Sequence, residues 1–474
     1  MQNQLELSTW LHQGGTPDLR RQMQLVLQLS IPAVLAELST IAMQYIDAAM
    51  VGSLGGGATA AIGLVSSTTW LFTGLCTAAA AGFSVQAAQL IGAQRIREAR
   101  NVLRQALLAS LALGLLLLAV GVSISAALPV WLGGEADICP DSSRYFFIYA
   151  CALPAAQFRL TAGGMLQCSG DMRTPSLLNI FMCGLDVVLN TLLIFPTRRI
   201  SILGLSITVI GAGLGVAGAA IGTALAQAAA AALMLYALCF RSPRLRLTGG
   251  GSWRFDRRCL RKALRLALPM AFEHGVLSGA QIVSTRIVAP LGTVSIAANS
   301  LAVTAESLCY MPGYGVGAAA TTLVGQSIGA QRPDMARRFA WLSVAMGAAV
   351  MTCTGGLMYL FAPQMLAMLT PDAAVRALGA RVLRIEAFAE PLYAASLVTA
   401  GALRGAGDTL IPGVLNLMSM WGVRITSAAW LAPRFGLPGV WMAMCCELCV
   451  RGLLFLFRLW RGKWISRCME NAAP

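Results

Sequence analysis

IPAVLAELSTIAMQYIDAAMVGSLG, residues 31–55, is the stretch that decides the fold. A helix of about 20 apolar residues crosses the roughly 30 Å hydrocarbon core of a bilayer, and this stretch is long and apolar enough to do so. It nevertheless carries Glu37, Gln44 and Asp47. A charge at the membrane centre costs about 3 kcal/mol on insertion scales, so two carboxylates in one span indicate a function.

A second copy of this stretch follows in the other half of the chain. Residues 268–292 read LPMAFEHGVLSGAQIVSTRIVAPLG, and Pro269 answers Pro32 at an offset of 237 positions. At the same offset, QLIGAQ at 89–94 returns as QSIGAQ, and GMLQCSGDMRTPSLLN from Gly164 returns as GALRGAGDTLIPGVLN from Gly401. One register kept over so long a stretch predicts an internal duplication.

The composition is typical of a polytopic, all-α membrane protein. Hydrophobic residues make up 57% of the chain, charged residues only 12%, and the mean hydropathy is +0.69. Soluble domains use about a quarter charged residues. The net charge of +15 comes from arginines in short loops, so we expect it to orient the chain in a membrane and not to bind nucleic acid. The 13 cysteines lie mostly in apolar segments, so we expect neither a metal site nor a cofactor.

Charged or Gly/Pro-rich breaks divide the apolar runs into twelve predicted transmembrane helices. In the first half these lie near residues 25–52, 59–90, 101–127, 144–166, 175–196 and 215–239. In the second half they lie near residues 263–289, 296–327, 338–363, 380–403, 412–432 and 437–459. The offset changes only at a longer loop, residues 196–213. An even number of spans per repeat predicts two parallel repeats about an axis along the membrane normal.

These spans predict five segments. They are a cytoplasmic N-terminal segment (1–24), an N-terminal six-helix lobe (25–240), a basic cytoplasmic linker (241–262), a C-terminal six-helix lobe (263–459) and a cytoplasmic tail (460–474). The linker is rich in arginine, so the positive-inside rule places it and both termini in the cytoplasm, beneath a plasma (inner) membrane. Two such lobes are typical of a transporter that binds its substrate between them.

Helical spacing gathers the buried polar residues of the N-terminal lobe into stripes. The stripes consist of Thr40, Gln44 and Asp47 in the first span, and of Asn179, Cys183, Asp186 and Asn190 in the fifth. Burial disfavours the charged form of a carboxylate, so Asp47 facing Asp186 would suit either proton carriage or Na⁺ binding. The alternative is that each acid only forms a hydrogen bond between helices.

Similar stripes in the C-terminal lobe predict a second cation or substrate site at Glu273, Glu306, Glu390 and Tyr310, with a purely structural use as the alternative. Glu386 lies nearer a predicted helix end and is a weaker candidate. Arg286 and Arg424 also lie near span ends, where we expect them to reach toward the interface instead of pairing with these acids.

The paired Gly-Asp segments, 164–171 and 401–408, are not phosphate-binding loops, because no GK[ST] follows them and no strand precedes them. We expect helix-to-helix turns there, with Asp171 and Asp408 as helix caps. No nucleotide-binding domain is predicted, so primary ATP-driven transport is not supported.

Four features together resemble the multidrug and toxic compound extrusion transporters. They are the aspartate before a VGxLG turn, the paired LxxxGDxxxP segments, LNTLLIF at Leu189 and the run APLGTVSIAANSLAVTAESLCYMPGYGVGAAATTLVGQSIGA from Ala289. The resemblance implies two six-helix bundles around a V-shaped central cleft, and efflux of organic cations or other amphipathic compounds in exchange for Na⁺ or H⁺. It places the family's first-helix acid at Asp47, and at Pro32 the proline about which some relatives bend that helix. Asp186 precedes Asn190, whereas relatives often carry the Asn before the Asp.

We therefore expect a cation-coupled antiporter, not an enzyme, that works as a monomer on small amphipathic substrates among membrane lipids. The runner-up is a flippase for lipid-linked precursors, which would need a cationic central cavity, whereas the stripes here are acidic. A membrane-embedded transferase is a third possibility. It would call for clustered acids or histidines at one membrane face and would not need an internal repeat.

Overall fold

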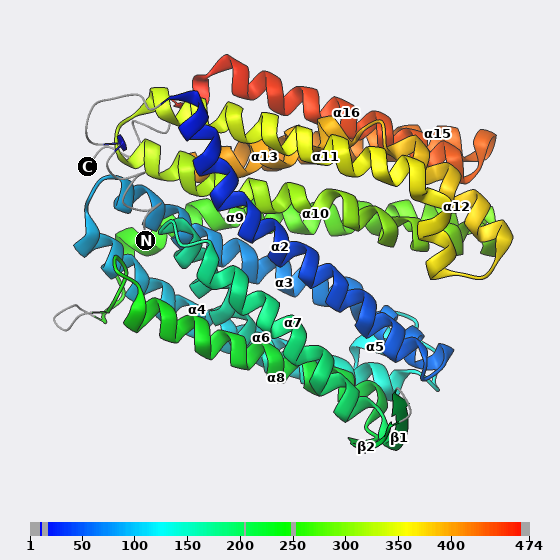
Figure 1. Ribbon diagram of the computed structural model, residues 1–474. Coiled ribbons are helices and arrows are strands. Elements are labelled where there is room, and N and C mark those ends of the chain that lie inside the picture. Colours follow the sequence, from blue (N-terminus) through cyan, green and yellow to red (C-terminus); the bar gives the residue numbers. More distant parts are fainter. Residues whose placement is uncertain (1–9, 12–17, 203–204, 248–252, 466–474) are drawn as a thin grey trace.

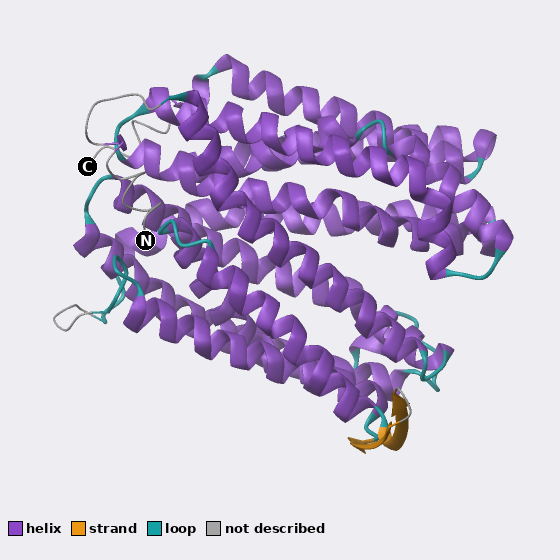
Figure 2. Cartoon of the chain, in the orientation of Figure 1, coloured by secondary structure: helices purple, strands orange, loops and turns teal. Residues whose placement is uncertain are grey.

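The computed structural model describes residues 10–11, 18–202, 205–247 and 253–465, and they are almost entirely helical (Figure 2). The first half of the chain contains α2 (Leu19–Gly52), α3 (Gly56–Gly92), α4 (Ile96–Ile124), the short α5 (Leu128–Trp131), α6 (Cys139–Cys168), α7 (Arg173–Ile194) and α8 (Gly215–Tyr236). A π-helical turn, η1 (Ala237–Arg241), extends α8. All six predicted spans of this half are present.

The second half contains α9 (Arg257–Val288), η2 (Ala289–Leu291), α10 (Thr293–Gly329), α11 (Pro333–Leu369) and α16 (Leu437–Arg461). The other two predicted spans are divided: one into α12 (Ala373–Glu386) and α13 (Glu390–Ala406), the other into α14 (Leu410–Leu417), the π-helix η3 (Met418–Ile425) and α15 (Thr426–Phe435). Pro391 stands in the first turn of α13, where its missing N–H needs no partner within the helix. Among the described residues, seven helices are long and apolar enough to cross a membrane.

Residues 196–213 were predicted to form a loop, but most of them form two β-strands. They contain an antiparallel hairpin of β1 (Pro196–Ile202) and β2 (Leu205–Ala212), in which Pro196 pairs with Ala212. Isoleucine, threonine and valine are frequent in this segment, and these β-branched residues favour strands.

The backbone confirms the internal repeat. The bounds of α10 are those of α3 shifted by 237 residues. Gln94 and Gln331, which differ by the same offset, both have positive φ, 60° and 58°. Positive φ is uncommon for residues other than glycine, so the two matched outliers mark the same turn built twice.

The helices form two bundles that adjoin at one end of the molecule and diverge toward the other (Figure 1). α3, α4, α6, α7 and α8 belong to one bundle, and α10, α11, α13 and α16 to the other. We call the end where α3 and α10 finish the linker end, and the end that carries β1 and β2 the hairpin end.

Helix α2 runs obliquely across both bundles (Figure 1). Near the linker end, Leu25 and Leu29 pack in one cluster with Leu323 of α10 and Phe339 of α11. Nearer the hairpin end, Val51 packs with Ile194 of α7 and with α8. Pro32 lies inside α2, which continues unbroken through it. A movement of α2 therefore changes packing contacts in both halves of the chain.

Candidate functional site

The first candidate site joins α2 to α7 through two carboxylates and one amide. Nδ2 of Asn190 donates to Oδ1 of Asp47 at 2.9 Å and to Oδ2 of Asp186 at 3.0 Å. Asp186 and Asn190 have no exposed surface, and Asp47 is half-buried. The α-helical period brings Asn190 one turn after Asp186, so both residues face α2. We call Asp47 and Asp186, which Asn190 holds together, the N-lobe acid pair.

Neither carboxylate of the N-lobe acid pair has a cationic partner in the part of the chain that the structure describes. Oδ1 of Asp186 and Oδ1 of Asn190 are buried and accept no hydrogen bond from a described residue. Two like charges this close in a low-dielectric interior repel, so the site favours the uptake of a proton or a cation. Carboxylate and amide oxygens are the ligands that hard cations prefer, so the residues also fit Na⁺.

Glycine on α8 allows this arrangement. A Cβ added at Gly222 would lie 2.0 Å from Oδ1 of Asn190, so a larger residue would displace the amide. Two other predicted members of the site lie elsewhere. Gln44 is exposed, and Asn179 accepts a hydrogen bond at 3.4 Å from Nη1 of Arg159.

Arg159 on α6 was missed by the sequence analysis. Its Nε is buried without a partner among the described residues, and it lies within electrostatic reach of Glu37 on α2 and Cys76 on α3. The available signal was an isolated arginine in the middle of the predicted span 144–166. The interior of this lobe therefore contains a cationic group beside its acids.

In the C-terminal half, Glu273 is held in a salt bridge. Its Oε1 accepts from Nη2 of Arg404 on α13 at 2.9 Å and from Nδ2 of Asn416 on α14 at 2.6 Å. The neighbouring His274 packs against α3, since a Cβ at Gly74 would lie 2.8 Å from its Cγ. This pairing favours the structural alternative for Glu273.

A group of three buried acids, Glu306, Glu386 and Glu390, lies deeper in the same half. Glu306 and Glu386 lie close enough for their charges to interact. The carboxylate oxygens of Glu386 and Glu390 are buried and accept no hydrogen bond from any described donor. Glu386 thus belongs to the group despite its place at the end of α12. Tyr310, one turn after Glu306, stacks near Tyr393, with the ring centres 5.6 Å apart.

Arg424 forms no ion pair with an acid among the described residues, as predicted, but its side chain turns into the protein instead of toward the interface. Arg424 lies in η3, with Nη2 2.7 Å from the sulfur of Met444, and its Nε is buried. It also interacts electrostatically with Glu306 and Glu386. The wider π-helical turn redirects this side chain, and such turns are frequent at functional sites. Arg286 is exposed, and its place at the interface stays a prediction.

A buried ion pair on α16 was also missed. Nε of Arg451 lies 3.1 Å from Oε1 of Glu447, one helical turn away, and Ser419 donates a hydrogen bond to the same carboxylate. Glu447 has no exposed surface. The spacing of four residues was visible in the sequence, but it does not distinguish a buried pair from an exposed one.

We expect Glu447→Ala to lower the free energy of unfolding by about 3–5 kcal/mol, because it leaves Arg451 buried without its partner. Glu98→Ala is the matched control, since it breaks the exposed Arg95–Glu98 pair and should cost less than about 1 kcal/mol. Thermal and denaturant unfolding of the purified protein measure both. Equal losses in the two variants would contradict the assignment.

Of the two predicted helix caps, Asp171 and Asp408, only the first is confirmed. Asp171 accepts hydrogen bonds from the backbone N of Thr174 at 3.1 Å and from its hydroxyl at 2.7 Å, which confirms a capping role at the start of α7. Asp408 instead forms an ion pair with Arg458 of α16, 2.6 Å long. The cap was wrongly predicted there because the sequence does not show that α16 passes close by.

The linker end is closed by a pseudo-symmetric contact that we call the linker-end crossing. Nε2 of Gln326 donates to the carbonyl oxygen of Cys168 at 2.8 Å, and Nε2 of Gln89 donates to that of Gly405 at 3.3 Å. Donors and acceptors both differ by the offset of 237. The helices cross so tightly that a Cβ at Gly92 would lie 2.0 Å from the oxygen of Gln326. A Cβ at Gly329 would lie 1.8 Å from the oxygen of Gln89.

The chain is similar to known proteins in both sequence and fold. The model of a family described as MatE matches the chain twice, over residues 32–192 and 269–430. The probable multidrug resistance protein NorM of Xanthomonas campestris pv. campestris is 29% identical, over 97% of this chain and 98% of that protein. A crystal structure of MATE in the straight conformation superposes with a TM-score of 0.85 at 22% identity, over 97% of this chain and 99% of that one.

A second solved structure, a MOP superfamily transporter from Pyrococcus furiosus, superposes with a TM-score of 0.86 at 20% identity, over 97% of this chain and 98% of that one. Its description reports a reverse polarity of the binding pocket. The two helical bundles of this chain therefore share the fold of these solved transporters. The chain belongs to the MatE family, whose two matched segments are the two halves of the repeat.

Proposed function

We propose that this protein is an antiporter that exports amphipathic organic cations in exchange for H⁺ or Na⁺, by alternating access. The observation that carries the proposal is the N-lobe acid pair, in which one amide nitrogen holds two carboxylates that have no cationic partner among the described residues. The site lies on α2, the helix that contacts both bundles. The orientation, with both termini in the cytoplasm of a plasma (inner) membrane, and a monomeric state are part of the proposal.

The N-lobe acid pair supports coupling through the position of α2. Binding of a proton or cation removes the repulsion between Asp47 and Asp186, which lets α2 approach α7 more closely. On the other side of α2, the hydroxyl of Tyr45 donates to the carbonyl oxygen of Thr304 on α10 at 2.5 Å. A ligand that binds one position of α2 more tightly shifts the balance between the two states of the transporter.

The linker-end crossing supports alternating access as the cycle. In this structure the bundles adjoin at the linker end and diverge at the hairpin end (Figure 1). The glutamine bonds of the crossing join α3 to α13 and α10 to α6, so the opposite state requires both to break together. Water can replace each bond at small net cost, because a typical hydrogen bond contributes only about 1 kcal/mol to stability. The crossing is thus strong enough to close one end and weak enough to open.

One observation favours the flippase alternative. Arg159 in one half has a buried Nε, and Arg451 in the other half is buried, so the interior is less purely acidic than the stripes indicated. A diphosphate head group would suit such cations. Efflux of ethidium against its gradient would support the antiporter, and movement of a lipid-linked diphosphate without ethidium efflux would support the flippase.

The coupling ion is tested in proteoliposomes in which a pH gradient and a Na⁺ gradient are imposed separately. We expect one of the two gradients to drive ethidium efflux at least tenfold faster than no gradient, without chemical conversion of the dye. Equal efflux with and without either gradient would contradict coupled transport. A converted product would instead support an enzyme.

A further inference from the structure

The feature that the transport cycle leaves unexplained is the charge of α12. This helix carries Arg376, Arg381 and Arg384, and its only acid, Glu386, is its last residue. α12 starts at the hairpin end, opposite the basic linker. In the proposed orientation its arginines therefore lie on the side of the membrane away from the cytoplasm, where the positive-inside rule predicts few of them. At the equivalent positions of the first repeat, Cys139 and Phe147 stand in place of Arg376 and Arg384.

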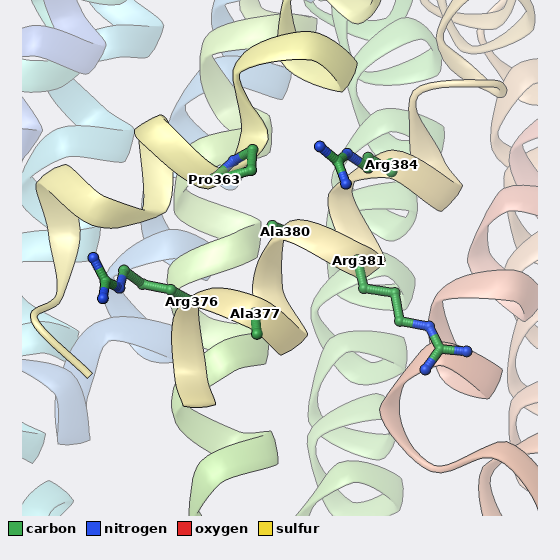
Figure 3. Close-up of a pocket in the computed structure, with 6 residues that line it drawn as sticks. All are labelled: Pro363, Arg376, Ala377, Ala380, Arg381 and Arg384. Atoms are coloured by element: carbon green, nitrogen blue, oxygen red, sulfur yellow. The ribbon is translucent and has the colours of Figure 1, made fainter. Parts of the chain in front are cut away.

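These arginines line a cavity of about 510 Å³ between α11 and α12. Pro363, Ala377 and Ala380 form the rest of the lining, and the two alanines leave the space open. In Figure 3 the guanidinium of Arg384 leans toward Pro363, Arg376 extends on the other side of the cavity, and Arg381 points away from both.

The guanidinium groups lack anionic partners within the described ranges. None of the three arginines forms an ion pair with a described residue. Arg384 donates one hydrogen bond, from Nε to the carbonyl oxygen of Tyr359 at 3.2 Å, and its guanidinium carbon lies 5.6 Å from the centre of the Tyr359 ring. This contact fixes the orientation of Arg384 and leaves its two terminal nitrogens available. A planar guanidinium donates two parallel hydrogen bonds to a phosphate.

An apolar surface adjoins the cavity. Leu360 and Phe361 of α11 are 64% and 50% exposed, and Phe388 is 72% exposed beside the Tyr359 ring. Tyr359 is exposed on this surface, and tyrosine is enriched at membrane interfaces, where head groups meet acyl chains. Arg376 and Arg384 lie about 12 Å apart along the helix axis, so the basic groups extend from this surface toward the end of the helix.

We propose that this cavity binds the phosphodiester head group of an anionic phospholipid. Arg376 and Arg384 contact the phosphate, and the acyl chains lie along the exposed face of α11. A lipid is favoured over a soluble anion because the basic cavity continues into exposed apolar side chains. The bound lipid would hold α12, the helix that ends at Glu386 of the buried acid group.

Native mass spectrometry of the purified full-length protein tests this proposal with phosphatidylglycerol and phosphatidylcholine as probes. We expect the wild type to retain phosphatidylglycerol preferentially, and Arg376→Gln/Arg384→Gln to weaken its binding at least tenfold. Arg286→Gln/Arg434→Gln is the matched control, because it removes two exposed charges at the same end and should change binding less than twofold. Ala377→Trp, which fills the cavity without changing charge, should also weaken binding.

Three results would overturn the proposal. Equal loss in both double variants would indicate general attraction between charges, and unchanged binding in Arg376→Gln/Arg384→Gln and Ala377→Trp would place the lipid elsewhere. Displacement of the lipid by millimolar inorganic phosphate would indicate a site for a soluble anion. The thermal midpoint of each variant, measured in the same detergent, identifies any loss of binding that comes from unfolding.

Discussion

Asp47→Asn is expected to reduce gradient-driven ethidium efflux at least tenfold while the protein stays folded. The substitution keeps an oxygen that can accept the 2.9 Å hydrogen bond from Asn190, so the geometry of the N-lobe acid pair is preserved. It removes the charge that repels Asp186 and the group that we propose takes up a proton or cation. A tenfold loss of rate corresponds to about 1.4 kcal/mol of activation free energy. Dye transport by proteoliposomes with a fixed imposed gradient measures the effect.

The matched control is Asp141→Asn, which makes the same chemical change at an exposed position in the first turn of α6. We expect its efflux to remain within twofold of the wild type. Undiminished gradient-dependent efflux by Asp47→Asn, or an equal loss in the control, would contradict the role assigned to Asp47.

Gly92→Ala and Gly329→Ala are expected to abolish transport by keeping the linker-end crossing from closing. The added Cβ atoms would lie 2.0 and 1.8 Å from backbone oxygens of the opposing helix, and backbone atoms cannot move aside as the tip of a side chain can. The bundles must therefore separate at this end, which disfavours the state seen here. Cys168, which is 4% exposed and whose carbonyl oxygen belongs to the crossing, should become reactive toward a maleimide.

Gly184→Ala provides the control, since no heavy atom lies within 4 Å of its added Cβ and the residue is also inside a helix. Its transport and the protection of Cys168 should match the wild type. If Gly92→Ala transports normally with Cys168 protected, the crossing is not a gate that must close.

Much of the architecture follows from features that a sequence displays directly. Span length and hydropathy predicted the membrane helices, and the constant offset predicted the duplication that the turns at Gln94 and Gln331 confirm. Helical spacing placed Asp186 and Asn190 on one face, and the structure brings Asp47 to them. Their role in ion coupling stays a prediction.

The errors arose where contacts between distant segments decide the outcome. Arg424 looked interfacial from its place near a span end, but the π-helical turn carries it toward Met444. Asp408 looked like a cap, but Arg458 lies within 2.6 Å of it. Gln44 shares a stripe with Asp47 but is exposed, because α2 turns only part of that stripe toward α7. Periodicity identifies a face of a helix, whereas the partner of that face depends on packing that one sequence does not display.

The most direct measurement of the central claim records dye efflux and counter-flux of the coupling ion in the same proteoliposomes. The protein is either the wild type or Asp47→Asn/Asp186→Asn, and dye binding is measured separately. We predict that the wild type moves H⁺ or Na⁺ inward whenever dye moves out, and that the double variant binds the dye but shows no coupled ion flux. A double variant that keeps the wild-type ratio of ion flux to dye flux would show that the N-lobe acid pair is not the coupling site.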